Sequence, residues 1–171
     1  MTLTDIPAGS AVYIDANIFV YHFAGASPQC REFLRRVESG DIQGYTGALV
    51  LLEVVHRLMI LEAVRRGLVS ASRPSVRLAS RPDVVQQLSH YQGQALRIPE
   101  MGVRVLELPR DFLARSFEFR QQFGLLTNDS VIALQMRDMG LRNLASADQN
   151  FDRAQGILRF GPSDLEEPLE G

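Results

Sequence analysis

The chain has 171 residues, of which 46% are hydrophobic and 22% charged, and its formal net charge is −2 at pH 7. These values are typical of one soluble globular domain and exclude a disordered chain, a membrane-spanning one and a uniformly basic nucleic-acid binder. A single cysteine, Cys30, excludes an internal disulfide, and the N-terminus lacks the basic start and apolar stretch of a signal peptide. We therefore expect a cytoplasmic protein with no membrane partner.

Apolar runs and helix signals alternate along the chain. In the first half of the chain, we expect a strand at 11–14, a helix capped by Ser27 with Pro28 first, a strand near 42–46 and a long helix ending around Gly67. A loop at 68–82 then precedes a helix at 83–96, a strand at 103–109 and a helix at 110–123. The last expected elements are a helix at 127–140 capped by Thr127 or Asn128, a strand ending near Ala145 and a strand in 157–162. Gly40, Gly124 and Gly140 indicate where three of these helices stop.

Alternating strands and helices predict an α/β fold with a central, mainly parallel sheet and helices on both faces. We expect a single domain at residues 1–162, followed by an acidic tail at 163–171 that frays. In such a sheet, ligands bind beyond the carboxyl ends of the strands. Acidic side chains at those ends are therefore the first candidates for a functional site.

Four acidic residues fall at such places. Asp15 directly follows the first strand and Asp148 follows a later one, so both are expected at the same edge of the sheet. Glu53 lies on an apolar helix that we expect to be buried, and Asp129 lies in the first turn of another helix. Each also has a simpler explanation, as a turn or helix-cap residue or, for Glu53, as the ion-pair partner of Arg57.

Converging carboxylates repel one another and raise one another's pKa values unless a cation lies between them. Oxygen ligands without a cysteine or histidine cluster suit Mg²⁺ or Mn²⁺ better than zinc. Such an ion is suited to a phosphodiester, because it neutralises the phosphate and lowers the pKa of the attacking water. The residues by themselves therefore predict a metal–carboxylate site.

The stretches YIDANIFVY, LLEVVHRL and LLTNDSVIALQMRDMGLRNLASADQNFD, with acids in the order Asp, Glu, Asp, Asp, resemble the PIN-domain ribonucleases, especially the VapC-type toxins of toxin–antitoxin pairs. The resemblance covers about residues 11–160. It implies a PIN fold and a Mg²⁺- or Mn²⁺-dependent endoribonuclease in which a metal-activated water cleaves RNA. The implied catalytic residues and metal ligands are Asp15, Glu53, Asp129 and Asp148.

The resemblance also implies supporting residues. Asn17 is expected to orient the first carboxylate or a water on the metal, Ser146 to hold that carboxylate through its hydroxyl, and Asn128 to support the site in a similar way. Many relatives carry a further acid two residues after the last Asp. That position is Asn150 here, so Asp152 is the candidate to assist in its place.

Arginines of the middle segment are candidates for gripping RNA phosphates, although a solvated surface explains them equally well. They are Arg57, Arg65, Arg66, Arg73, Arg77 and Arg81. The resemblance further implies a homodimer and an antitoxin partner, while the segment 67–103 looks longer than in the compact toxins. Two alternatives stay open: a degenerate site that serves as an RNA- or partner-binding module, and an RNA-processing nuclease that is not a toxin.

Overall fold

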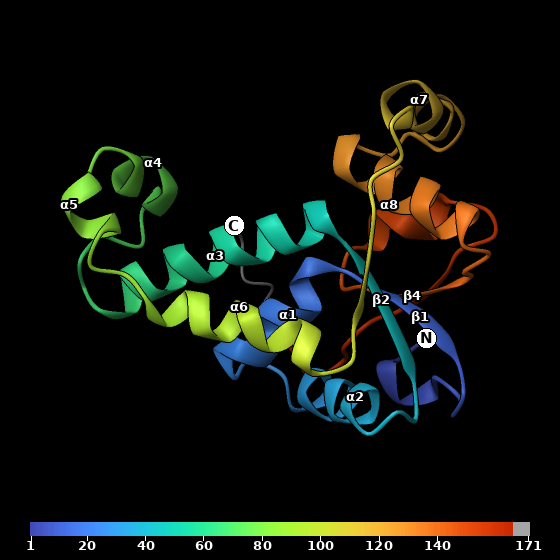
Figure 1. Cartoon of the computed structure of the whole chain (residues 1–171), viewed down its shortest axis with the longest axis horizontal. Helices are drawn as coiled ribbons and strands as arrows, with labels where there is room; N and C mark the ends of the chain where they lie inside the picture. Colours follow the sequence, from blue (N-terminus) through green and yellow to red (C-terminus); the bar gives the residue numbers. More distant parts are fainter. Residues whose placement is uncertain (166–171) are drawn as a thin grey trace.

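The computed structural model describes residues 1–165, within which five parallel strands form one sheet in the order β3-β2-β1-β4-β5 (Figure 1). The strands are β1 (Ala11–Ile14), β2 (Gln43–Gly47), β3 (Arg104–Leu106), β4 (Asn143–Ala145) and β5 (Leu158–Phe160). The buried runs of β1 and β4 form the centre of the main hydrophobic core. The predicted α/β fold with a parallel sheet is confirmed.

Helices cover both faces of the sheet, since the chain winds in two directions. It moves from β1 through β2 to β3 on one side and then returns past β1 to β4 and β5 on the other. Right-handed crossovers in opposite directions put their helices on opposite faces. Accordingly, α2 and α8 lie on opposite sides of the strands in Figure 1. The helices are α1 (Ala16–Ala24), α2 (Pro28–Glu38), α3 (Ala48–Arg65), α4 (Pro74–Ala79), α5 (Pro82–Val85), α6 (His90–Glu100), α7 (Phe112–Phe123) and α8 (Thr127–Asp138), with short 3₁₀ turns η1 (Leu3–Asp5) and η2 (Gln149–Arg153).

Local sequence signals gave several element ends correctly. The hydroxyl of Ser27 accepts the backbone N–H of Cys30 at 3.0 Å and caps α2, as predicted. Gly124 follows α7 in the left-handed conformation that favours glycine. The predicted cap of α8 is wrong, because Leu126 holds the N-cap position and the helix begins at Thr127.

Three expectations about helices are wrong. The helix α1 was missed, since its apolar side chains are not periodic: Ile18, Phe19 and Val20 are all buried. The expected loop at 68–82 contains α4, and the expected helix at 83–96 is divided into α5 and α6.

The helix α3 is not buried all round, contrary to expectation. Val50, Val54 and Leu58 form its buried stripe, whereas Leu52 is 66% exposed. The helix packs on α1 and α6, and these two cover only part of its circumference. Its remaining apolar side chains are therefore available to line a surface.

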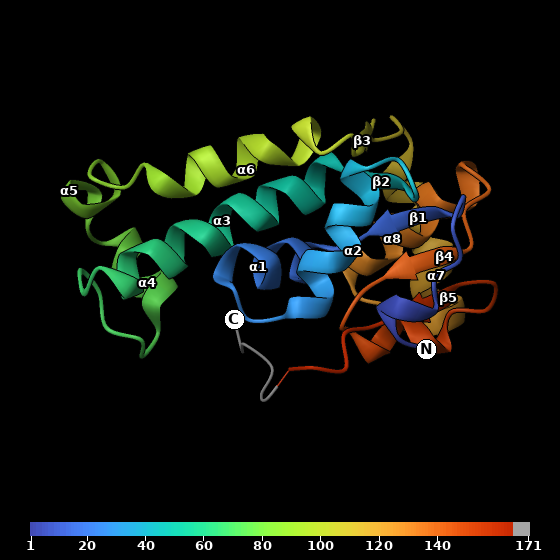
Figure 2. The same ribbon diagram turned by 90° about the horizontal axis from the view of Figure 1, so that it is seen from below.

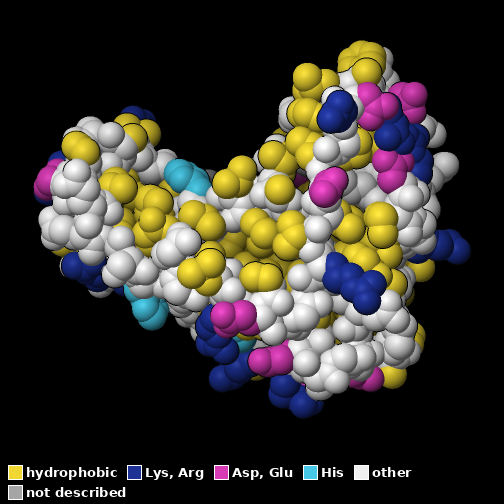
Figure 3. All heavy atoms as spheres, viewed as in Figure 1, with side chains coloured by type: hydrophobic (Ala, Val, Ile, Leu, Met, Phe, Trp, Pro, Cys, Tyr) yellow, Lys and Arg dark blue, Asp and Glu magenta, His cyan; other side chains and the backbone are white. Residues whose placement is uncertain are grey.

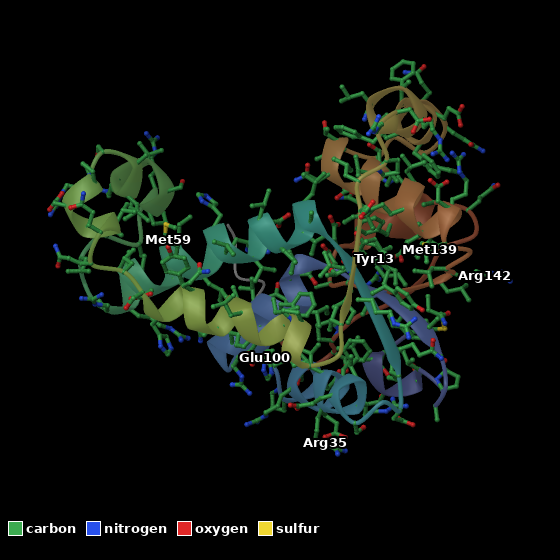
Figure 4. All side chains as sticks on the ribbon, viewed as in Figure 1. Tyr13, Arg35, Met59, Glu100, Met139 and Arg142 are labelled. Carbon is green, nitrogen blue, oxygen red and sulfur yellow. The ribbon has the colours of Figure 1, made fainter. Side chains whose placement is uncertain are left out.

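The segment 67–103 forms most of an arm that extends from the sheet. In Figure 2, α3 and α6 run side by side along it, with α4 and α5 at the far end. These short helices have a small core of their own, which includes Leu78, Val84 and Leu88. Met59 of α3 packs against this small core and lies toward that end of the arm in Figure 4.

Glu62 fastens the two long helices of the arm together. This buried carboxylate accepts the backbone N–H groups of Ser89 (3.2 Å) and Tyr91 (2.9 Å) at the start of α6. It also pairs with Arg66 at 3.2 Å. Burial raises the pKa of Glu62, but the hydrogen bonds outweigh burial and hold the pKa below its ordinary value.

A buried polar bridge joins the sheet to α8. The Tyr13 hydroxyl donates to Gln135 Oε1 at 2.7 Å, and Gln135 Nε2 donates to the carbonyl of Glu107 at 3.0 Å. Figure 4 shows Tyr13 between the end of β2 and α8. The bridge passes so close to Gly47 that a Cβ there would lie 2.4 Å from Gln135 Oε1 and 2.6 Å from the Tyr13 hydroxyl.

The chain after β5 returns to α2. Ser163 N–H donates to Gln29 Oε1 at 2.9 Å, and Asp164 Oδ1 accepts the Ser27 hydroxyl at 2.6 Å. These two residues belong to the segment 163–171 that was predicted to fray, and residues 166–171 of that segment lie outside the described residues. That 1–162 form one domain stays a prediction. None of the helices in the described part of the chain is both long and apolar enough to span a membrane.

We predict that Glu62→Gln lowers the free energy of unfolding by about 1–3 kcal/mol at neutral pH, because buried N–H donors lose a charged acceptor. The pKa of Glu62 is lower in the folded chain than in the unfolded one. The contribution of this carboxylate to the free energy of unfolding is therefore complete above the unfolded pKa and is lost as the pH falls through the folded pKa. Urea unfolding should therefore show a difference from wild type that shrinks below about pH 4. Glu32→Gln, at an exposed pair with Arg35, is the control and should change little. A constant difference across this pH range would contradict the assignment.

We also predict that Gly47→Ala lowers the free energy of unfolding by about 1–3 kcal/mol, because the added methyl group overlaps the Tyr13–Gln135 bridge. Gly93→Ala is the matched control, since Gly93 lies in α6 with nothing within 4 Å of its added Cβ. That change should stabilise the chain by about 0.5–1 kcal/mol. Equal effects of the two substitutions in urea unfolding would rule out the steric explanation.

Candidate functional site

The carboxyl ends of β1 and β4 meet at the middle of the sheet. The two strands are parallel neighbours, with Ile14 opposite Ala145. The chain leaves β1 toward one edge of the sheet and β4 toward the other, so a crevice opens between their ends. The backbone N–H of Asp15 donates to the carbonyl of Ala145 at 3.0 Å, which fixes the first carboxylate at this crevice.

Asp15 is buried, and three donors hold its carboxylate. Oδ1 accepts the backbone N–H of Ala16 at 2.7 Å and so caps α1. Oδ2 accepts the hydroxyl of Ser146 and the side-chain amide of Asn17, each at 2.6 Å. Asp15 therefore caps α1 and also borders the crevice, so its role as a helix cap does not exclude a role at the candidate site.

Asn17 and Ser146 tie the ends of β1 and β4 together. Asn17 Oδ1 accepts the backbone N–H of Ala147 at 3.0 Å, across the crevice from its own helix. The Ser146 oxygen accepts the backbone N–H of Asp148 at 3.0 Å. One small network therefore fixes the positions of the first and last candidate acids relative to each other.

Glu53 reaches the same crevice from α3, which begins directly after β2. Its side chain is 39% exposed, and its Oε1 lies 3.7 Å from Arg57 Nη1, one turn along the helix. The ion pair between Glu53 and Arg57, which was the simpler explanation for Glu53, is therefore present in the structure. Both side chains also line the groove described below.

Asp129 and Asp148 complete the set from two further elements. Asp129 is in the first turn of α8, next to Asn128, and both line the groove. Asp148 follows β4, and its Oδ1 accepts the backbone N–H of Asn150 at 2.8 Å to cap η2. Acids from four places in the sequence therefore border one surface depression.

The pKa directions show that these acids influence one another. Burial raises the pKa of Asp15, and the charge of Asp148 adds to this, while the hydrogen bonds to Asp15 oppose it. Burial and then the charge of Asp15 raise the pKa of Glu53, against the effect of Arg57. Burial raises the pKa of Asp129 most, and the charges of Asp148 and Asp15 raise it further. The acids therefore form one electrostatic group.

The depression is a groove of about 1100 Å³ that runs from these acids along α3 to the arm. Asn17 and Tyr21 of α1 and Ile60 and Val64 of α3 line its middle, and Pro74 of α4 lines its far end. The longer segment 67–103 thus supplies part of the groove wall. Tyr21 went unnoticed in the sequence because α1 was not recognised, although it lies one turn after Asn17 on that helix.

The side chains around the crevice offer oxygen donors, which suit Mg²⁺ or Mn²⁺. Among residues 1–165, however, no group of three or more His, Cys, Asp or Glu side chains is arranged so that it could hold a metal ion. The ion pair between Glu53 and Arg57 keeps one of the four carboxylates engaged elsewhere. The donor chemistry of these side chains fits such a cation.

Several predicted residues lie elsewhere. Asp152 does not line the groove. Its two carboxylate oxygens instead accept hydrogen bonds from the Arg159 guanidinium, at 2.7 and 2.9 Å. Arg66 is engaged by Glu62 and by the carbonyl of Gln87, so its expected role in RNA binding is not supported.

Of the six arginines that the sequence offered as candidates for RNA binding, Arg57 lines the groove. Arg65 donates to the carbonyl of Ala24 at the end of α1 at 2.7 Å. Arg73 is exposed at the N-cap of α4, in a left-handed conformation with φ of 48°. The next residue, Pro74, lines the far end of the groove, whereas Arg73 is not among the lining residues.

Comparison with known proteins agrees with this fold. The chain is similar to VapBC2 from Rickettsia felis bound to a DNA fragment from its promoter, with a TM-score of 0.57, 14% identity, and 89% of this chain and 98% of that chain covered. It is also similar to a toxin–antitoxin complex from Klebsiella pneumoniae, with a TM-score of 0.53, 18% identity, and 86% and 95% covered. At such identities the likeness shows the fold alone. No curated protein sequence matches the chain.

The sequence itself matches the PIN domain family over residues 12–157. This match runs from β1 to the residue just before β5, and it includes all four acids at the crevice. The chain therefore belongs to the PIN domain family.

Proposed function

We propose that the chain is an endoribonuclease that depends on Mg²⁺ or Mn²⁺ and acts as the toxin of a toxin–antitoxin pair. The observation that supports this most is the meeting of acids from four elements, Asp15, Glu53, Asp129 and Asp148, in one groove of a PIN domain. A divalent cation bound among them would neutralise charge on a phosphodiester and lower the pKa of an attacking water.

In this proposal, the chain's own residues fix the geometry of the reaction. Ser146 and Asn17 hold one oxygen of Asp15 in place, so this carboxylate does not have to be reorganised when substrate arrives. Asp129 and Asp148 border the opposite side of the crevice, and Asn128 supports them. The RNA backbone runs along α3, where Arg57 can donate to a phosphate.

Partners also belong to the proposal. The two structural relatives are a VapBC protein and a toxin–antitoxin complex, which favours an antitoxin partner. Figure 3 shows hydrophobic atoms spread across the hollow face between the arm and α7. Leu52 of α3, Leu96 of α6 and Phe117 of α7 are among the exposed hydrophobic side chains of the described residues. Such a surface suits a second copy of the chain or another protein. A cytoplasmic location completes the proposal.

A binding module with a degenerate site is the alternative. Two observations favour it: Glu53 is paired with Arg57, and Asp152 is paired with Arg159 outside the groove. An RNA-processing nuclease that is not a toxin would share the site and differ only in its cellular effect. The experiments below separate these three functions.

We predict that RNA is cleaved only when Mg²⁺ or Mn²⁺ is added, and that Asp15→Asn and Asp129→Asn each reduce the rate by about 100-fold or more. Cleavage of a labelled RNA measures this. Asp138→Asn is the matched control, because Asp138 lies on α8 with Asp129 but pairs with Arg115 outside the groove. Wild-type rates in both site variants would refute the nuclease, and RNA binding without turnover in the unmodified chain would favour the binding module.

The same chains test the toxin function. Expression of the unmodified chain should arrest growth, and expression of Asp15→Asn should not. Growth that continues while the purified chain cleaves RNA would favour the RNA-processing nuclease.

We further predict opposite effects of Asp129→Asn on the free energy of unfolding with and without metal. Without a divalent cation, the variant should be more stable than wild type at neutral pH, because the charges of Asp148 and Asp15 no longer oppose a third charge. With excess Mn²⁺, wild type should gain more stability than the variant, since a ligand that binds the folded state stabilises it. Thermal unfolding in EDTA and in MnCl₂ measures both, and an equal gain from Mn²⁺ in the two chains would contradict a site that includes Asp129.

A further inference from the structure

The peptide group between Ser146 and Ala147 lies at the crevice, just past the end of β4. Its N–H donates to Asn17 Oδ1 at 3.0 Å, and its C=O accepts a hydrogen bond from Arg159 Nη1 at 3.2 Å. Asn17 follows β1 and Arg159 belongs to β5, and these strands flank β4 in the sheet. Two side chains therefore hold this one peptide group from the two sides of β4.

The chain at this peptide group carries two parts of the candidate site. The Ser146 hydroxyl donates to Asp15 at 2.6 Å, and the same oxygen accepts the backbone N–H of Asp148 at 3.0 Å. A rotation of the Ser146–Ala147 peptide would therefore displace both the hydroxyl and Asp148. Whatever holds this peptide also fixes Asp15 and Asp148 relative to each other.

The contacts of Arg159 hold its guanidinium in one orientation. The residue lies on β5, at the edge of the sheet beside β4 (Figure 2), and its side chain is 15% exposed. Nε and Nη2 donate to the two carboxylate oxygens of Asp152, while Nη1 donates to the Ser146 carbonyl. These hydrogen bonds hold the pKa of Asp152 below its usual range, so the pair stays charged at neutral pH. A planar guanidinium makes both contacts at once, whereas the single nitrogen of a lysine does not span them.

Gly161 leaves the space that this arrangement needs. A Cβ at this position would lie 2.7 Å from Arg159 Nη1 and 3.1 Å from the carbonyl oxygen of Ser146. A side chain there would therefore push the guanidinium away from the carbonyl. The contact can thus be disturbed without changing Arg159 itself.

We propose that Arg159 is a positioning residue of the candidate site, where it fixes the Ser146–Ala147 peptide and, through it, Asp148. Asp152 orients the guanidinium and so acts through Arg159, outside the set of metal ligands. Arg159 is not among the residues that line the groove, so it does not contact RNA bound there. The hold on the peptide needs neither metal nor RNA, whereas an effect on metal binding or cleavage rests on the proposed function.

Hydrogen exchange of the metal-free chain tests the contact itself. In Arg159→Lys, the backbone N–H groups of Ala147 and Asp148 should exchange about 10-fold faster than in wild type, as expected for the loss of one hydrogen bond from a charged donor. Gly161→Ala, which keeps Arg159, should accelerate the same two groups.

Arg35→Lys is the matched control for hydrogen exchange. Arg35 binds Glu32 through Nε and Nη2 in the same way, at 2.8 and 2.6 Å, but lies on α2 (Figure 4). This variant should leave the exchange at Ala147 and Asp148 unchanged. Wild-type exchange at these two groups in both Arg159→Lys and Gly161→Ala would overturn the proposal. Equal acceleration along β1 and β2 would show a general loss of stability and would also overturn it.

Mn²⁺ binding, measured by calorimetry, and RNA cleavage test the consequence for the site. Arg159→Lys should weaken Mn²⁺ binding about 10-fold. It should also lower kcat and leave KM for RNA unchanged, because Arg159 does not line the groove. Asp152→Asn should have a smaller effect on Mn²⁺ binding, and adding it to Arg159→Lys should change nothing further, since both act through one peptide group.

Two results would contradict this consequence. They are additive effects of the two substitutions on Mn²⁺ binding, and a rise in KM without a fall in kcat. If the wild-type chain neither binds Mn²⁺ nor cleaves RNA, the proposed function fails, while hydrogen exchange still decides whether Arg159 holds the peptide.

Discussion

Repulsion between carboxylates at the end of the parallel sheet is the constraint on which the site depends. The fold brings Asp15 and Asp148 to adjacent strand ends, and α3 and α8 bring Glu53 and Asp129 to the same groove. Burial and neighbouring charge raise the pKa of three of them. A chain tolerates such a group only when other contacts keep the acids in place, and the hydrogen bonds of Ser146 and Asn17 do so from both sides of the crevice.

The arm changes what this crevice can bind. A crevice at the strand ends alone would hold an ion and one phosphate. Because α3 continues well beyond Glu53, and Glu62 fastens α6 against it, the wall extends to Pro74 of α4. The groove becomes an elongated surface with acids at one end and apolar side chains beyond them. If the proposed function holds, selectivity for a particular strand of RNA then depends on the arm rather than on the acids.

The sequence was most informative where short-range chemistry decides structure. Ser27, Pro28 and the strand ends could be placed because capping and burial are local, and the order of acids placed the crevice. The sequence was least informative where tertiary packing decides. The apolar run after Asp15 forms α1 because it is buried on most sides, and α3 is partly exposed because α1, α6 and α4 together cover only part of its surface. Asp152 was misplaced for a similar reason, since its partner Arg159 lies on another element, β5.

Arg57 connects these observations. It lies one turn from Glu53 and supplies the positive charge that the crevice needs in its present form. A cation among the acids would compete with it for Glu53, since one carboxylate oxygen cannot bind both at full strength. Such a cation would weaken this ion pair, and Arg57 would stay on the groove wall, where the proposed function places the RNA backbone. The ion pair therefore limits repulsion among the acids of the resting chain, and a paired Glu53 is compatible with catalysis as well as with a degenerate site.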